Sequence, residues 1–188
     1  MDYQRHTLET ERLLVRLADR DDAQELIDYD RRNADHLRRW EPARDPEILS
    51  DVEARARSLA RGVAAAEAGQ AYLFLARSRD LASGVIAVAH LSEVIRGILQ
   101  GCYLGYSVDA AYEGQGIAAE AVSAVVQFAF QTLRLHRVMA NYQPANERSA
   151  ALLRRLGFVP EGYARDYLFI DGAWRDHILT SLVNTDLH

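Results

Sequence analysis

Residues 101–119 read GCYLGYSVDAAYEGQGIAA, and they are the most informative stretch of the chain. An apolar run typical of a β-strand leads through a short turn into Gly114-x-Gly116, and a long helical pattern begins straight after it. Such a turn exposes backbone N–H groups at a helix N-terminus, where the helix dipole adds partial positive charge. The stretch therefore predicts a strand–helix junction that binds a phosphate-bearing ligand.

The composition is that of an ordinary soluble globular protein. The chain has 188 residues, of which 49% are hydrophobic and 26% charged, so we expect one domain over residues 1–188. The net charge of −5 argues against a dedicated nucleic-acid binder. Cys102 is the only cysteine and the six histidines lack metal-ligand spacing, so we expect no disulfide and no metal.

The N-terminal segment MDYQRHTLETERLL lacks the apolar region of a signal peptide. No run approaches the ~20 apolar residues that a membrane-spanning helix requires. We therefore expect a cytoplasmic protein that does not bind a membrane.

Hydrophobic periodicity predicts a mixed α/β sheet with helices on both faces. A first strand is indicated by Leu13, Val15 and Leu17, and a loop by the segment HLRRWEPARDP. Helices are expected at 19–33, 46–68, 116–133 and 147–156, and further strands at 72–77, 84–91, 101–108, 138–143, 163–170 and 174–183.

The glycine turn has three possible ligands. Gly114-x-Gly116-x-x-Ala119 matches the loose dinucleotide-binding pattern, which also requires an acidic residue about 20 positions later. The next strand offers Asn141 and Gln143 instead, and several strands precede the turn, so a dinucleotide is disfavoured. A P-loop is excluded because no Gly-Lys-Ser/Thr follows. Coenzyme A is the third candidate, because its pyrophosphate needs only converging N–H donors. A turn that serves only to connect the strand to the helix stays an open alternative.

A second segment, beginning at Asn146, bears on the same choice. Asn146 has the character of a helix N-cap. Ser149 lies three, four and seven residues before Leu152, Leu153 and Leu156, so its hydroxyl shares their inward face and needs a partner. That hydroxyl either bonds back to the first helical turn or faces the thioester end of a cofactor.

These motifs resemble those of the GNAT acetyltransferases, in which the pattern [QR]-x-x-G-x-[GA] binds the pyrophosphate of acetyl-CoA. The matching stretch here is EGQGIA, with Glu113 at the position of Gln or Arg. The segments TERLLVRLADRDD, WEPARD, HRVMANYQPANERSAALLRRLGF and EGYARDYLFIDGAWRDHILTSL are similar to the RimJ/RimL branch of that family, and above all to its ribosomal-protein alanine N-acetyltransferases. The similarity extends over nearly the whole chain.

The resemblance implies a mostly antiparallel sheet of about seven strands, splayed in the middle, with about four helices on its two faces. It implies transfer of acetyl from acetyl-CoA to the N-terminal α-amino group of a ribosomal protein, with alanine as the acceptor residue, by direct attack in a ternary complex. The acceptor would belong to the small ribosomal subunit, with no direct nucleic-acid contact, and the enzyme would be a monomer or homodimer.

The resemblance also implies the cofactor site. Ser149 would protonate the departing thiolate, and Asn146 would hydrogen-bond the pantetheine. The cofactor-binding residues are expected to be Tyr106, Ser107, Val108, Gly114, Gln115, Gly116, Ile117, Ala118, Ala119, Asn141, Asn146 and Ser149.

The acceptor amine needs only a weak base. An α-amine has a reference pKa of about 7.7 to 8.0, against about 10.4 for lysine, so it is partly neutral at pH 7. Glu41 in the WEP loop is the first candidate for the base, followed by Tyr106 and Asp166. The acceptor entrance is expected at Trp40, Tyr103 and Tyr167, with Glu41 and Asp166 attracting a basic N-terminus. The alternative for the three aromatic residues is packing in the core, and the alternative for Glu41 is a solvated loop carboxylate without a catalytic role.

Two other functions stay open at the level of sequence. A small-molecule amine N-acetyltransferase, acting on a polyamine or an aminoglycoside, would share the cofactor half and differ in the acceptor loops. A non-enzymatic module could bind coenzyme A or dock on a ribosome without catalysis.

Overall fold

One mixed sheet organises the protein, whose computed structural model describes residues 7–80 and 84–186. Within these ranges eight strands follow the order β1-β2-β3-β4-β5-β6-β8-β7. Neighbours pair antiparallel except β5 and β6, which run parallel. The strands are β1 (Thr7–Glu9), β2 (Leu13–Leu17), β3 (Tyr72–Ser78), β4 (Val85–Ile95), β5 (Gly101–Val108), β6 (Arg137–Met139), β7 (Val159–Ile170) and β8 (Ala173–Val183). The predicted fold class is confirmed, with β1 as the strand beyond the expected seven.

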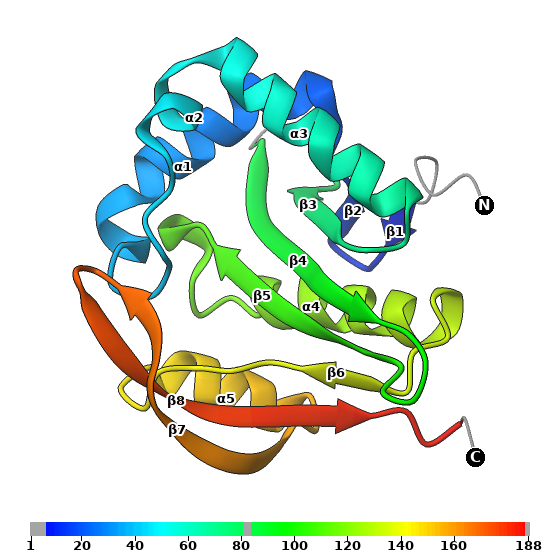
Figure 1. Cartoon of the computed structure of the whole chain (residues 1–188). Coiled ribbons are helices and arrows are strands. Elements are labelled where there is room, and N and C mark those ends of the chain that lie inside the picture. The colour runs from blue at the N-terminus through cyan, green and yellow to red at the C-terminus, as the bar shows by residue number, and fades with distance from the viewer. Residues whose placement is uncertain (1–6, 81–83, 187–188) are drawn as a thin grey trace.

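Helices cover both faces of this sheet, as expected (Figure 1). They are α1 (Ala23–Leu37), α2 (Pro46–Ser50), α3 (Val52–Glu67), α4 (Ile117–Gln127) and α5 (Glu147–Arg155). The alternation of side chains along β3 feeds two cores, because Leu75 packs with α1 and α3 while Phe74 packs with α4. The π-helical turn Phe128–Thr132 extends α4 almost to the predicted end at residue 133.

The sheet is splayed between β5 and β6. These strands pair only from Gly101–Tyr103 to Arg137–Met139, although β5 continues to Val108. After Met139 the chain keeps only its pairing with β8, through the amides of Ala140 and Tyr142. The two strands diverge beyond that point (Figure 1), so the splay implied by the resemblance is confirmed. It also explains why the strand expected at 138–143 is only three residues long.

The helix expected at 46–68 is interrupted at Asp51. Asp51 has extended backbone angles, and its carboxylate accepts the N–H groups of Glu53 and Ala54 as the N-cap of α3. The capping hydrogen bonds of Asp51 therefore divide the expected helix in two, and Val52 at the start of α3 is 40% exposed.

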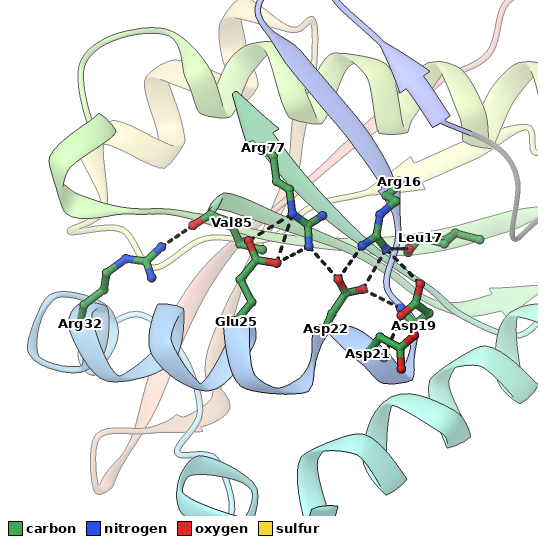
Figure 2. A network of polar contacts seen from close by, with 9 residues as sticks. All are labelled: Arg16, Leu17, Asp19, Asp21, Asp22, Glu25, Arg32, Arg77 and Val85. Carbon is green, nitrogen blue, oxygen red and sulfur yellow. Dashed lines mark hydrogen bonds and ion pairs between the residues drawn. The ribbon is translucent and has the colours of Figure 1, made fainter. Parts of the chain in front are cut away.

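A network of ion pairs fixes the start of α1 to the sheet (Figure 2). The carboxylate of Asp22 is buried and accepts from Arg16 on β2 and from Arg77 on β3, with N–O distances of 2.5 to 2.8 Å. It also accepts the N–H of Asp19 and so closes a capping box. Because α1 leads directly into the loop that carries Trp40 and Glu41, this network helps to position that loop.

None of the helices in the described ranges is both long and apolar enough to cross a bilayer.

Candidate active site

A cavity of about 1340 Å³ opens where β5 and β6 diverge. Its walls come from the loop after α1, from β4 and β5, from the glycine turn, from the first turn of α5 and from the β7–β8 hairpin. Fifteen of the predicted site residues line it, namely Trp40, Glu41, Tyr103, Tyr106, Ser107, Val108, Gly114, Gly116, Ile117, Ala118, Ala119, Asn141, Asn146, Ser149 and Tyr167. The structure thus gathers residues from four distant parts of the chain.

Gln115 and Asp166 are not among the lining residues. The Gln115 side chain donates to the carbonyl of Ala111. Asp166 is exposed at a bulge of β7 with φ of 49°, and its N–H donates to the Asp176 carboxylate at 2.9 Å. A residue in that bulge is turned away from the alternation of its strand, which the sequence pattern does not reveal.

The glycine turn is shaped to receive an anion. Gly114 and Gly116 have φ of 71° and 80°, in the left-handed region, and α4 begins directly after them. A Cβ at position 116 would lie 3.3 Å from Nη2 of Arg12, so a side chain would crowd the turn. Arg12 is itself held by Glu120, and its Nη1 donates to the Gln115 carbonyl at 2.8 Å. Free N–H donors backed by a helix N-terminus fit a pyrophosphate.

The hydroxyl groups of Tyr106 and Ser149 form a hydrogen bond of 2.6 Å. Asn146 caps α5 by accepting the Ser149 N–H at 3.0 Å, as its N-cap character predicts. The Ser149 hydroxyl is therefore aimed at β5 rather than back at its own helix. Burial raises the pKa of Tyr106 to about 12, although the hydrogen bond with Ser149 acts in the opposite direction. The Tyr106 hydroxyl is consequently protonated at neutral pH.

Asn141 holds an aromatic wall of the cavity in place. Its Nδ2 donates to the Tyr167 hydroxyl at 3.1 Å, and its Oδ1 accepts the N–H of Thr180 at 3.3 Å. The amide is thus engaged on both sides by the β7–β8 hairpin. Burial raises the pKa of Tyr167 above its ordinary value, so this hydroxyl also stays protonated.

Glu41 lies at the cavity wall and is held by a chain of charges. Its Oε2 is 2.8 Å from Nη2 of Arg44, and Nε of Arg44 is 3.4 Å from Oδ1 of Asp30 on α1. Asp30 is buried and also pairs with Arg55 on α3 at 2.8 Å. The loop after α1 is therefore anchored to both helices, and the Glu41 carboxylate is engaged by a cation.

Sequence reasoning missed His177, a buried residue of β8 that also lines the cavity. Its ring packs against Tyr167 with centroids 5.4 Å apart, and its Nδ1 is 3.0 Å from the Arg175 carbonyl. The available signal was an imidazole directly before the apolar pair Ile178 and Leu179 in the last predicted strand.

Glu113, at the position where the motif has Gln or Arg, pairs with Arg148 on α5. Its second oxygen lies 3.3 Å from Nε2 of His36 in the last turn of α1. All three residues line the cavity.

Comparison with known proteins agrees with this geometry. A family model for the acetyltransferase (GNAT) domain matches residues 12–159. The ribosomal protein uS5-alanine N-acetyltransferase of Escherichia coli is 44% identical over 179 residues, which cover 95% of this chain and 91% of that protein.

Two solved structures share the fold over almost the entire chain. The ribosomal-protein-S5-alanine acetyltransferase from Vibrio fischeri has a TM-score of 0.92 at 37% identity, covering 97% of this chain and 99% of that one. RimJ of Mycobacterium smegmatis, solved in complex with a CoA-disulfide, has a TM-score of 0.85 at 28% identity, covering 93% and 83%. The chain therefore belongs to the GNAT acetyltransferase family.

Proposed function

We propose that this protein transfers an acetyl group from acetyl-CoA to the N-terminal α-amino group of a ribosomal protein that begins with alanine, with uS5 as the first candidate. The observation that carries the proposal is the single cavity joining the glycine turn to the Tyr106–Ser149 hydroxyl pair. The 44% identity to an enzyme named for uS5 supports a protein acceptor over a polyamine or an aminoglycoside.

Acetyl-CoA supplies an activated acetyl thioester when bound. The backbone of the turn at Gly114 and Gly116 would hold the pyrophosphate, and the part of β5 beyond its pairing with β6 would hold the pantetheine arm. Ile117, Ala118 and Ala119 form the first turn of α4 on the cavity wall and would add their part of the helix N-terminus to that site. Direct acyl transfer then depends largely on orientation of the two reactants.

Ser149 delivers the proton that the departing sulfur requires. In this scheme Tyr106, which its raised pKa keeps protonated, donates to Oγ of Ser149, and water returns to Ser149 the proton that it gives up to the sulfur. The Ser149 proton is then free to face the cavity, in reach of a leaving group. Asn146 fixes this geometry, because its cap orients the first turn of α5.

The acceptor enters between the aromatic residues Trp40, Tyr103 and Tyr167. Glu41 is the base in this proposal, acting directly or through water on an α-amine whose reference pKa is about 7.7 to 8.0. Because Arg44 engages Glu41, the carboxylate is held in one orientation. Asp166 has no role in this scheme, since it lies outside the cavity.

Mass spectrometry of ribosomal proteins from a deletion strain tests the proposal. We expect one protein, beginning with alanine and belonging to the small subunit, to lose the mass of one acetyl group at its N-terminus. Complementation with the wild-type gene should restore it, and an unchanged set of N-termini would overturn the ribosomal acceptor. The cytoplasm is the compartment in which this acceptor would be met.

A further inference from the structure

Glu113, His36 and Arg148 form a cluster, here called the Glu113 cluster, at the edge of the glycine turn. Glu113 directly precedes Gly114, Arg148 comes from the first turn of α5, and His36 from the last turn of α1. Three elements thus converge on the carboxylate that replaces the Gln or Arg of the family motif.

The ion pair of the Glu113 cluster contributes little to stability by itself. The side chain of Arg148 is 73% exposed, and an exposed pair is typically worth about 0 to 1 kcal/mol. A lone carboxylate next to a phosphate site would also repel the ligand, since like charges about 4 Å apart interact by roughly 1 to 4 kcal/mol between water and a protein surface. The position of Arg148 beside Glu113 is therefore better explained by ligand binding than by the stability of the fold.

We propose that Arg148 binds the pyrophosphate of coenzyme A, and that Glu113 is the positioning residue that holds Arg148 beside Gly114. This inference rests on the proposed function, because it takes acetyl-CoA as the cofactor. A guanidinium has five N–H donors in a fixed fork, and the contact with Glu113 involves only Nη1 of Arg148. The remaining donors can face phosphate oxygens while the carboxylate fixes the side chain.

The orientation of α5 supports this division of roles. Ser149 is directed at Tyr106 on β5, whereas its neighbour Arg148 is directed at the turn before α4. One turn of helix thus serves two ends of the same cavity, with a hydroxyl at one and a cation at the other. Arg148 supplies from α5 the positive charge that an arginine at position 113 supplies in the family motif.

The variant Glu113→Gln distinguishes a positioning role of Glu113 from simple repulsion of phosphate, because the two predict opposite changes in the Kd for coenzyme A. Gln is a residue of the family motif at this position, so the turn can accommodate it. If Glu113 positions Arg148, the change releases Arg148 and weakens binding of coenzyme A several-fold. If Glu113 only repels phosphate, the same change tightens binding, and the proposal is overturned.

Calorimetry with coenzyme A and with dephospho-coenzyme A tests the assignment directly. We expect Arg148→Ala to raise Kd about tenfold for both ligands, which corresponds to about 1.4 kcal/mol. Arg148→Lys should retain part of the affinity as a point charge. Arg154→Ala is the matched control, because Arg154 is exposed on α5 and does not line this cavity, and its Kd should equal that of the wild type.

Failure of the proposed role of Arg148 and failure of the proposed function give different results in these experiments. Wild-type affinity in Arg148→Ala would overturn the role of Arg148 while leaving the cofactor intact. A loss seen only with coenzyme A, and absent with dephospho-coenzyme A, would assign Arg148 to the 3′-phosphate and overturn the pyrophosphate contact. Failure of the wild-type protein to bind either ligand would instead overturn the proposed function. Thermal unfolding of each variant excludes loss of folding as the cause.

Discussion

The hydroxyl oxygens of Tyr106 and Ser149 lie 2.6 Å apart and connect β5 to α5 across the opening of the sheet. This contact exists because β6 leaves β5 after Met139, which clears the space that a fully paired strand would fill. The same divergence forms the cavity and places a half-buried, protonated tyrosine behind the only hydroxyl that the first turn of α5 carries. The hydrogen bond is therefore a local consequence of the splay.

Replacing Ser149 by Ala should lower kcat by about 100-fold, the scale of a lost general acid. The Kd for coenzyme A should stay close to the wild-type value, because the pyrophosphate turn and the edge of β5 are unchanged. Steady-state kinetics with an alanine-initiated peptide, combined with calorimetry, measures both. Tyr106→Phe should give a smaller loss, since Ser149 keeps its proton and loses only the donor that orients it. An unchanged kcat in Ser149→Ala would remove this hydroxyl from the mechanism.

The pH dependence of kcat/KM should show one rising limb and no falling limb up to about pH 10. The rising limb follows the acceptor amine, whose reference pKa is about 7.7 to 8.0. The pKa of Tyr106 is raised to about 12 by burial, so the hydroxyl that donates to Ser149 stays protonated throughout that range. A tyrosine with its ordinary pKa of about 10 would produce a falling limb there. Observation of such a limb would show that another acid supplies the proton.

Gly116→Ala should raise the KM for acetyl-CoA about tenfold. An alanine at φ of 80° is strained by roughly 1 to 2 kcal/mol, and its Cβ would lie 3.3 Å from Arg12 Nη2. The backbone must shift to relieve the strain or the close contact with Arg12, and that shift moves the N–H groups that would face the phosphate.

Gly62→Ala is the control for a glycine replacement without these constraints. Gly62 lies inside α3, and in the described part of the chain nothing beyond its chain neighbours and its own helix backbone lies within 4 Å of an added Cβ. The change should therefore stabilise the fold by up to about 1 kcal/mol. Equal KM values for wild type and Gly116→Ala would mean that the turn does not contact the cofactor.

Local chemistry made part of this site predictable from sequence. Gly114 and Gly116 indicate a turn in the left-handed region, because other residues rarely adopt positive φ. The helical spacing of Ser149 from Leu152, Leu153 and Leu156 places Ser149 on the same face of the helix as these leucines. Both inferences use residues within two helical turns of each other, and the structure places them on the cavity wall, apart from Leu153 in the core and Leu156 packed against it.

The remainder of the site depends on contacts between distant segments. Tyr106 and Ser149 are 43 positions apart, and Glu41 reaches α3 only through Arg44 and Asp30. No periodicity encodes such pairings. Asp166 illustrates the opposite error, because a bulge in β7 changes which way a strand residue faces without any change in the hydrophobic pattern.

Asp22→Asn should lower the free energy of unfolding by about 1.5 to 3 kcal/mol at neutral pH, because it removes a buried charge that pairs with Arg16 and Arg77, although Asp19 and Glu25 still contact these arginines. Burial alone would raise the pKa of Asp22, but the hydrogen bonds and charge of Arg16, the N–H of Asp19 and the charge of Arg77 together hold it below its ordinary value.

Because the folded-state pKa of Asp22 lies below that of the unfolded chain, its contribution is fully present above the unfolded value of about 3.9 and is lost as the pH falls through the folded value. The difference in stability between wild type and Asp22→Asn should therefore shrink as the solution is acidified below about pH 4. Urea unfolding at a series of pH values measures it. Asp28→Asn is the control, since Asp28 is exposed on the same helix and accepts only from Gln24, and it should change stability by no more than about 0.5 kcal/mol. A difference between wild type and Asp22→Asn that stays constant down to low pH would show that packing, and not the charge of Asp22, accounts for the loss.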